Sequence, residues 1–280
     1  MTSAVQLPEQ PKRVPWVTAL GALSQRWEDY KKTPVDMTIS PVDDMLGKGG
    51  VSHYRQVGTS ALEVISQAML LGRKTTFPKI LDLPCGGGRV TRHLVKFFPE
   101  SEIYVCDAEK PKEDFVASHF NLPRYETPID FAGEPSQRVD LIFVGSLFTH
   151  LNQDLFKAAM LYLISALEPG GLLIATLHGR DRANVFVRRQ REQAATRQGL
   201  PAPRAELLKN IEKHFFAEGF TFQQRTVVGT IPYGVTFSAP SWILKLAEAR
   251  QDVTILGLQE AGWAGNQDVL VLSKKAPPTI

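Results

Sequence analysis

The fold of this chain is decided by one stretch, Ile80-Leu81-Asp82-Leu83-Pro84-Cys85-Gly86-Gly87-Gly88-Arg89-Val90. An apolar run, Lys79–Leu83, predicts a short strand with an acidic residue at its end, and the spacing of Val90–Phe98 predicts a helix. Glycine is suited to the turn between them, because any Cβ there would collide with a closely bound ligand. The helix also offers free backbone N–H groups at its start. The stretch therefore predicts a ligand-binding turn.

Strands and helices alternate downstream of this turn. The predicted strands are Glu102–Cys106, Val139–Val144, Leu172–Leu177, Phe220–Val228, Val253–Leu258 and Asp268–Ser273. The predicted helices are Pro111–Phe120, Asn152–Leu167, Ala205–Glu218 and Pro240–Arg250, and Ile231–Ala239 is predicted to be an aromatic loop. This order predicts an α/β fold: a doubly wound, Rossmann-like, mainly parallel sheet covered on both faces. The last two strands are expected to form an antiparallel C-terminal edge.

Two regions lie outside this alternation. Residues 1–77 are predicted to form a Pro-rich leader and an N-terminal helical cap, and residues 78–280 the main domain. In the cap, Val14–Lys32 and Ala61–Leu71 have helical spacing, the second capped by Thr59 or Ser60, with a loop at Thr33–Ser52 between them.

Residues 179–219 are predicted to be an arginine-rich lid or insertion within the main domain. Its first part, residues 180–204, has seven arginines, at positions 180, 182, 188, 189, 191, 197 and 204, and two acidic residues, Asp181 and Glu192. Such a stretch fits a lid that recruits an acidic substrate, an RNA-contacting surface, or a solvated helix face. Phe186 is the single aromatic residue between positions 180 and 204, which argues against the base stacking that single-stranded nucleic acid requires.

The composition is that of an ordinary globular protein, and it excludes several classes. Of 280 residues, 43% are hydrophobic and 22% charged, and the net charge of +3 is too small to indicate nucleic-acid binding. There is no run of about 18 apolar residues, so no membrane span is expected. Two cysteines make no disulfide framework, which favours a cytoplasmic location. The histidine and cysteine spacings match no zinc site, so no metal is expected.

A second acidic residue, Asp107, ends the strand after the glycine turn, 19 positions beyond Gly88. An acid there is placed to accept hydrogen bonds from ribose hydroxyls, which predicts a nucleoside-type cofactor. A dinucleotide fingerprint needs a third glycine, where this chain has Thr91. Asp82, moreover, would repel a pyrophosphate and suit a cation such as the ammonium group of a methionine moiety.

These residues resemble the first two motifs of the class I S-adenosylmethionine-dependent methyltransferases: Asp82, Gly86 and Gly88 match the first, and Asp107 the second. The resemblance spans about residues 78–177, where Val139–Phe143 is similar to the family's fourth strand and Leu167–Leu173 to the turn before its fifth. Pro84 departs from the pattern, because its φ is locked near about −65° where many members have glycine. The implied cofactor is S-adenosyl-L-methionine, with S-adenosyl-L-homocysteine as product.

The resemblance also implies a set of site residues. The expected cofactor-binding residues are Asp82, Pro84, Cys85, Gly86, Gly88, Asp107, Ala108, Asp130, Ser146 and Leu147. Asp130, after a third strand, either contacts the adenine amino group or caps a turn. His150 and His178 follow strands on the ligand side, where a neutral imidazole can take a proton from an acceptor hydroxyl; His150 can alternatively cap a helix. Tyr233 and Arg180 are expected to contact the acceptor.

The expected function is therefore methyl transfer, with O-methylation of a small molecule or sugar-type acceptor favoured. Many amino-group methyltransferases have Asn-Pro-Pro-Tyr after the fourth strand, whereas this chain has Gly145-Ser146-Leu147. Segments such as Thr176–Arg180 and Gln267–Val269 resemble a subgroup associated with glycan or secondary-metabolite modification. A small-molecule or glycan partner is expected, not nucleic acid or a membrane. Two alternatives stay open: an NAD(P)-dependent oxidoreductase, and a non-catalytic RNA- or nucleotide-binding module on the same fold.

Overall fold

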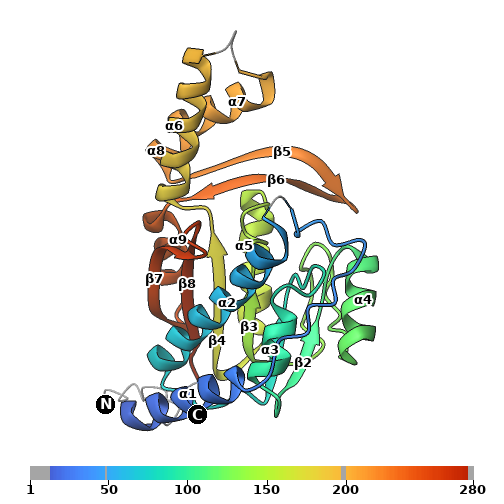
Figure 1. The fold of residues 1–280 in the computed structure, drawn as a ribbon. Helices are drawn as coiled ribbons and strands as arrows, with labels where there is room; N and C mark the ends of the chain where they lie inside the picture. Colours follow the sequence, from blue (N-terminus) through green and yellow to red (C-terminus); the bar gives the residue numbers. More distant parts are fainter. Residues whose placement is uncertain (1–12, 48, 197–199, 277–280) are drawn as a thin grey trace, which may run out of the picture.

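A six-stranded sheet forms the centre of the computed structural model, which describes residues 13–47, 49–196 and 200–276 (Figure 1). Its strand order is β2-β1-β3-β4-β8-β7. The strands are β1 (Lys79–Asp82), β2 (Glu102–Val105), β3 (Val139–Val144), β4 (Leu167–Leu177), β7 (Val253–Trp263) and β8 (Gln267–Lys274). The first four are parallel, and β8 runs antiparallel to both β4 and β7. The predicted α/β class is confirmed, with β8 as the antiparallel C-terminal strand and β7 outside it.

Helices cover both faces of the sheet because alternate strand residues point to opposite sides. On β3, Leu141 and Phe143 join the apolar core under the helices α1 (Trp16–Lys31), α2 (Gly50–Gly72) and α3 (Thr91–Phe97). Ile142 and Val144 join the core under α5 (Gln153–Ser165) and α9 (Pro240–Glu248). A further helix, α4 (Lys110–Phe120), packs beside β2. Continuous apolar strands are thus explained by burial on both faces.

A second, two-stranded sheet lies across the end of the main sheet (Figure 1). It is a hairpin of β5 (Phe220–Val228) and β6 (Ile231–Ser238). Above it, in the same view, rise α6 (Arg180–Thr196), α7 (Ala202–Asn210), a π-helical turn (Ile211–Phe215) and α8 (Phe216–Glu218). The helices share a small apolar core with β6, built around Phe237, Ala183 and Phe215. Figure 1 also shows that this unit stands at the carboxyl ends of the parallel strands.

Four local predictions were wrong. Helix α2 begins at Gly50, well before Ala61, because Tyr54 and Val57 continue its buried face through a stretch that its glycines made look like loop. Ile231–Ser238 is strand β6, not a loop. β4 begins at Leu167, which the sequence placed in the preceding helix. The third strand expected before Asp130 is reduced to one bridge between Val105 and Arg124. Arg197 and most of the predicted leader, residues 1–12, lie outside the described residues.

Candidate functional site

The glycine turn after β1 is tied to the end of β2. The backbone N–H of Gly86 donates to Oδ2 of Asp107 at 2.8 Å, and the N–H of Cys85 donates to the carbonyl of Cys106 at 3.0 Å. Gly86 and Gly88 have φ values of 52° and 83°, the left-handed region that favours glycine. Pro84 enters the turn through a cis peptide bond. Two expected motifs, one from each strand, therefore meet in a single turn.

Asp82 is buried beneath this turn, with 1% of its surface exposed. The hydroxyl of Thr91 donates to its Oδ2 at 2.6 Å. The pKa of Asp82 is raised to about 7, mainly by burial and also by the nearby Asp107, against the opposing effects of Thr91 and Arg89. A buried carboxylate in this position is stabilised by a cation, so it suits a positively charged ligand group.

Asp107 holds the loop that follows β2. Its Oδ1 accepts from the N–H of Glu109 at 2.8 Å while its Oδ2 accepts from Gly86. Burial raises the pKa of Asp107 against these two backbone hydrogen bonds. An ionised carboxylate has about four acceptor sites, so two bonds leave capacity for two further donors such as ribose hydroxyls.

A cavity of about 280 Å³ opens beside Asp107. Its lining residues are Leu83, Pro84, Cys106, Asp107, Ala108, Glu109, Lys110, Thr127, Pro128, Ile129, Phe131, Leu147, Leu151, Val228, Ile231 and Tyr233. Five site residues expected from sequence are among them: Pro84, Asp107, Ala108, Leu147 and Tyr233. The remaining wall is mostly apolar, which is the usual composition of a small-molecule site.

Two stretches of this wall were missed from the sequence. One is the loop from Thr127 to Phe131, whose apolar side chains belong to no motif. The other is the hairpin, which contributes Val228 and Ile231. The alternation of Ile231, Tyr233 and Val235 with smaller residues is the period of a strand and was the available signal.

The other six expected cofactor residues do not line the cavity: Asp82, Cys85, Gly86, Gly88, Asp130 and Ser146. Cys85 is a buried free thiol whose pKa is raised mainly by burial. Asp130 is exposed, and its Oδ1 accepts from the backbone N–H of Ala132 at 3.1 Å, as in a turn. Ser146 follows β3 with a φ of 66°, a backbone conformation that non-glycine residues rarely adopt.

Hydrogen bonds hold Ser146 in that conformation. Its N–H donates to Oγ1 of Thr176 at 2.8 Å, and its Oγ accepts from Nε2 of Gln267 at 2.9 Å. Thr176 in turn donates to Oε1 of Gln267 at 2.6 Å. Residues from β3, β4 and β8 therefore fix the start of the loop that carries Leu147 and His150.

His150 lies between this loop and the hairpin, stacked on Tyr233 with ring centroids 4.5 Å apart. Its Nδ1 is 2.7 Å from the carbonyl oxygen of Gly234. A carbonyl only accepts, so Nδ1 carries the proton and Nε2 of the neutral ring has a free lone pair. Burial lowers the pKa of His150, which favours this neutral form. Burial also raises the pKa of Tyr233 to about 12, with Asp107 and Glu109 adding to the effect.

His178 and Arg180 occupy different environments at the end of β4. The pKa of His178 is lowered to about 3, mainly by burial and also by the nearby Arg182 and His150. Its Nδ1 is buried and has no hydrogen-bond partner in the described part of the chain. Arg180 is exposed, pairs with Glu260 and does not line the cavity. The two histidines therefore lie close together, whereas Arg180 does not join them.

The loop before α2 is fastened to the outside of the glycine turn. The buried guanidinium of Arg92 donates to the carbonyls of Asp36 at 2.6 Å, of Thr38 at 3.1 Å and of Gly88 at 2.8 Å. A Cβ at Gly87 would lie 2.3 Å from a carboxylate oxygen of Asp43. The N-terminal segment is thus part of the support of the turn.

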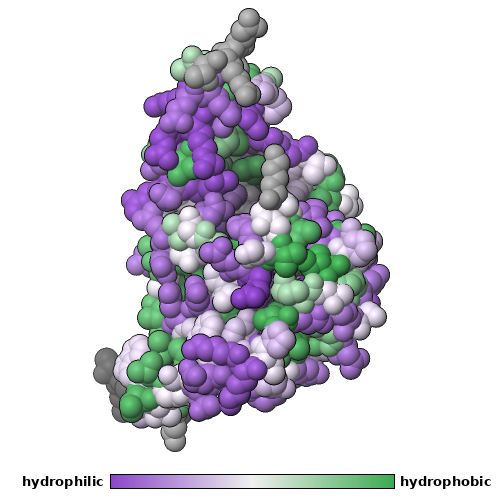
Figure 2. Space-filling model, viewed as in Figure 1, coloured by the Kyte–Doolittle hydropathy of each residue, from purple (hydrophilic) through white to green (hydrophobic). Residues whose placement is uncertain are grey.

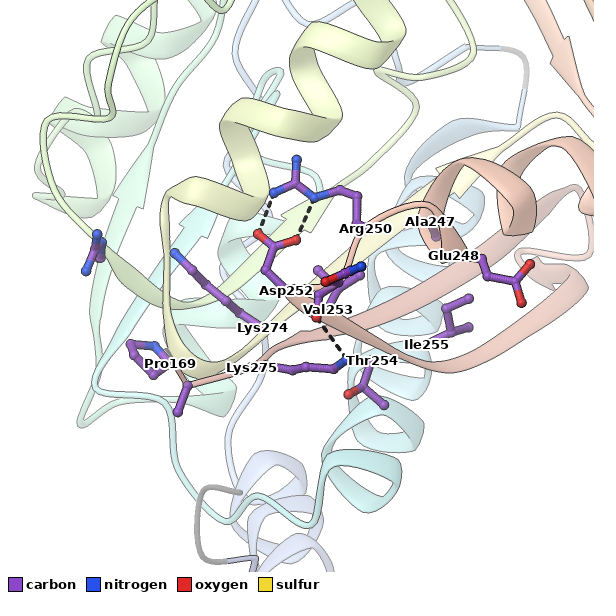
Figure 3. A pocket seen from close by; sticks show the side chains of 13 residues that line it. Pro169, Ala247, Glu248, Arg250, Asp252, Val253, Thr254, Ile255, Lys274 and Lys275 are labelled. Atoms are coloured by element: carbon purple, nitrogen blue, oxygen red, sulfur yellow. Dashed lines mark hydrogen bonds and ion pairs between the residues drawn. The ribbon is translucent and has the colours of Figure 1, made fainter. Parts of the chain in front are cut away.

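A larger cavity, of about 920 Å³, lies at the opposite end of the sheet, where β4 begins (Figure 3). Figure 3 shows that Arg250 pairs with Asp252, and Lys275 donates to the carbonyl of Gln251. Lys274 donates to the carbonyls of Ser165 and Leu167. Ligands of open parallel sheets bind at the carboxyl ends of the strands, so the smaller cavity is the candidate site.

The described ranges hold neither a metal cluster nor a membrane-spanning helix. Over residues 13–47, 49–196 and 200–276, no cluster of three or more His, Cys, Asp or Glu side chains is arranged to hold a metal ion. Among the helices in the same ranges, none has the length and apolar character needed to cross a membrane.

Comparison with known proteins gives matches of three kinds. Residues 80–171 match the family described as a methyltransferase domain. A malonyl-[acyl-carrier protein] O-methyltransferase of Halalkalibacterium halodurans is 30% identical over 139 residues, which are 47% of this chain and 51% of that relative. The aligned part thus spans about half the length of the curated relative.

Solved structures share the fold at low sequence identity. An S-adenosylmethionine-dependent methyltransferase from Clostridium acetobutylicum has a TM-score of 0.51 and 13% identity, covering 80% of this chain and 92% of its own. The 1,6-didemethyltoxoflavin-N1-methyltransferase of Burkholderia thailandensis has a TM-score of 0.50 and 12% identity, covering 97% and 95%. The family match falls on the part of the sheet that carries the glycine turn, so residues 80–171 are a methyltransferase domain.

Proposed function

We propose that the protein transfers a methyl group from S-adenosyl-L-methionine to an oxygen atom of a small-molecule or sugar-type acceptor. The observation that carries this proposal is the pair of buried carboxylates at the glycine turn, Asp82 and Asp107, beside a largely apolar cavity. A dinucleotide would bring a pyrophosphate toward Asp82, whereas a methionine moiety brings an ammonium group. The pair therefore favours this cofactor over the nicotinamide alternative.

The residues present fit the cofactor group by group. Asp107 would accept hydrogen bonds from the ribose hydroxyls, and Asp82 would offset the ammonium charge. Ile129, Phe131 and Leu147 offer apolar surface for the adenine ring. When bound, the cofactor supplies an electrophilic methyl group. The contribution of the protein is then mainly to position the acceptor oxygen and exclude water.

Proton transfer is assigned to His150. Its Nε2 lone pair is free because Nδ1 is held by Gly234, and its lowered pKa keeps the ring neutral. Nε2 can take the proton of an acceptor hydroxyl as the oxygen gains the methyl group. An oxygen acceptor is supported by the similarity to the malonyl-[acyl-carrier protein] O-methyltransferase, about half of whose length aligns with this chain. We assign residues 179–219, together with the hairpin, to a lid over the acceptor.

The His150→Gln variant is expected to lower kcat by about 10- to 100-fold, because glutamine keeps a polar side chain but supplies no base. The dissociation constant for S-adenosylhomocysteine is expected to stay within about twofold of the wild-type value. Both quantities are measured by turnover assays and by calorimetric titration. His214→Gln, on the outer helices, is the matched control and should change neither. An unchanged kcat in His150→Gln would make His150 a structural residue.

The acceptor class is tested with methyl-labelled S-adenosylmethionine and a cell extract, whose products are separated into small molecules, glycans, protein and nucleic acid. Label in the first two fractions is expected. Label confined to RNA or protein would contradict the proposed acceptor class. Failure of the protein to bind S-adenosylhomocysteine would contradict the cofactor assignment itself.

A further inference from the structure

One face of α6 carries two arginines with a phenylalanine between them. Arg182, Phe186 and Arg189 are spaced by four and three residues, which places them on the same side of a helix. The ring of Phe186 is 6.1 Å from that of Phe237 on β6. Phe186 is therefore turned toward the hairpin, whereas Arg189 is exposed. Figure 2 shows that the surface over α6 and α7 is largely hydrophilic.

Arg182 is half-buried yet has no acidic partner. Elsewhere on this unit, Arg180 pairs with Glu260 and Arg191 pairs with Glu212. For Arg182 and Arg189, no ion pair forms with any carboxylate of the described residues. Burial lowers the pKa of Arg182, and the charge of Arg189 lowers it further. A half-buried cation next to a second cation is costly unless an anion compensates both.

Arg182 lies close enough to His178 to lower the pKa of that histidine. His178, one helical turn before it in sequence, is neutral, and its ring lies 5.4 Å from Phe237. The buried Nδ1 of His178 has no partner in the described ranges, so this corner also leaves a hydrogen bond unmade. His178 lies close enough to His150 that a charge on His150 lowers the pKa of His178. The arginine face thus borders the side of the site assigned to the acceptor.

We propose that Arg182 and Arg189 bind a phosphate monoester group of the acceptor. This inference rests on the proposed function and names its substrate class: a phosphorylated molecule whose free hydroxyl is directed to His150. Two guanidinium charges match a phosphate dianion, whereas a monocarboxylate leaves one of them uncompensated. The planar guanidinium also presents paired N–H donors that suit phosphate oxygens. Phe186 and Phe237 offer apolar surface beside this subsite.

The test follows the arginine side chains directly by NMR. Inorganic phosphate is titrated into ¹⁵N-labelled protein saturated with S-adenosylhomocysteine, and the Nε–Hε resonances are recorded at constant ionic strength. The resonances of Arg182 and Arg189, assigned from the Arg182→Gln and Arg189→Gln spectra, are expected to shift in a saturable manner. Sodium acetate is expected to bind about tenfold more weakly. Arg182→Gln should weaken phosphate binding at Arg189 by about tenfold or more.

Arg188→Gln is the matched control, because Arg188 is exposed on another face of α6. It should leave the phosphate dissociation constant within about twofold. If Arg188→Gln and Arg182→Gln weaken phosphate binding equally, the effect is one of net charge and the proposal is overturned. The absence of saturable shifts in the wild-type protein would also overturn it. Since S-adenosylhomocysteine binding is measured in the same samples, loss of phosphate binding alone contradicts the subsite. Loss of S-adenosylhomocysteine binding in the wild type contradicts the proposed function.

Discussion

The Asp82→Asn variant is expected to stabilise the ligand-free protein above pH 7 and to weaken S-adenosylmethionine binding by about 10- to 100-fold. Burial raises the pKa of Asp82 to about 7 from its ordinary value of 3.8, so between these values the folded state holds a proton that the unfolded state has released. Stability from this group is therefore present below pH 4 and is lost as the pH rises to 7. Asparagine has no charge to bury and escapes that loss.

The expected gain at pH 8 is about 1–3 kcal/mol, or a rise in Tm of about 2–8 °C. This gain in the free energy of unfolding is smaller than the pKa change of Asp82 alone would give, because Thr91 loses its hydrogen bond to a charged acceptor. Thermal unfolding between pH 4 and 8.5 measures it, with the exposed Asp114→Asn as control. If the variant is less stable than wild type at pH 8 and binds the cofactor equally well, Asp82 is a structural acid.

The Asp107→Ala variant is expected to weaken S-adenosylhomocysteine binding by about 10²- to 10⁴-fold. The reason is that one carboxylate accepts from two ribose hydroxyls, at about 1.5–3 kcal/mol for each hydrogen bond to a charged group. Alanine also leaves the N–H groups of Gly86 and Glu109 without their acceptor, so the turn loses its tie to β2. Calorimetric titration gives the affinity, and circular dichroism shows whether the fold is retained.

Asp130→Ala is the control for this loss, because Asp130 was expected from sequence to contact the adenine but is exposed and bonded to Ala132. Its affinity should stay within about twofold of wild type. If the Asp107→Ala protein is folded and its affinity for S-adenosylhomocysteine is unchanged, the ribose does not bind at the end of β2. A large loss of affinity in Asp130→Ala would instead show that the Asp130 side chain, in the 127–131 loop, contacts the adenine.

The main sheet was predictable because burial on both faces leaves a strong pattern. Val139–Val144 was placed correctly from its continuous apolar run. Phe220–Val228 was also placed to the residue, although it belongs to the hairpin and not to the main sheet. The expected boundaries failed where local signals competed with packing. Gly49 and Gly50 suggested a loop, yet the apolar face of α2 extends back to Tyr54 because it packs on the core.

The site was predictable where chemistry is concentrated in a motif and not where it depends on tertiary contact. Asp82 and Asp107 follow from the strand–turn–helix pattern. The tautomer of His150 depends on Gly234, 84 residues away in sequence, which no local pattern reveals. Pro232 and Gly234 made β6 resemble a loop in the sequence. The part of the cavity wall that the hairpin forms was therefore not predicted.

The position of the hairpin also predicts the order in which cofactor and acceptor bind. Its residues Val228 and Ile231 close the cofactor cavity, while the N–H of Gly234 donates to the carbonyl of His150 at 3.0 Å on the acceptor side. The same hairpin therefore borders both proposed ligand sites, and an acceptor seated against it would block the cofactor's path. We expect compulsory-order kinetics, with the cofactor entering first and leaving last. The residence time of S-adenosylhomocysteine, and not the transfer itself, would then limit turnover.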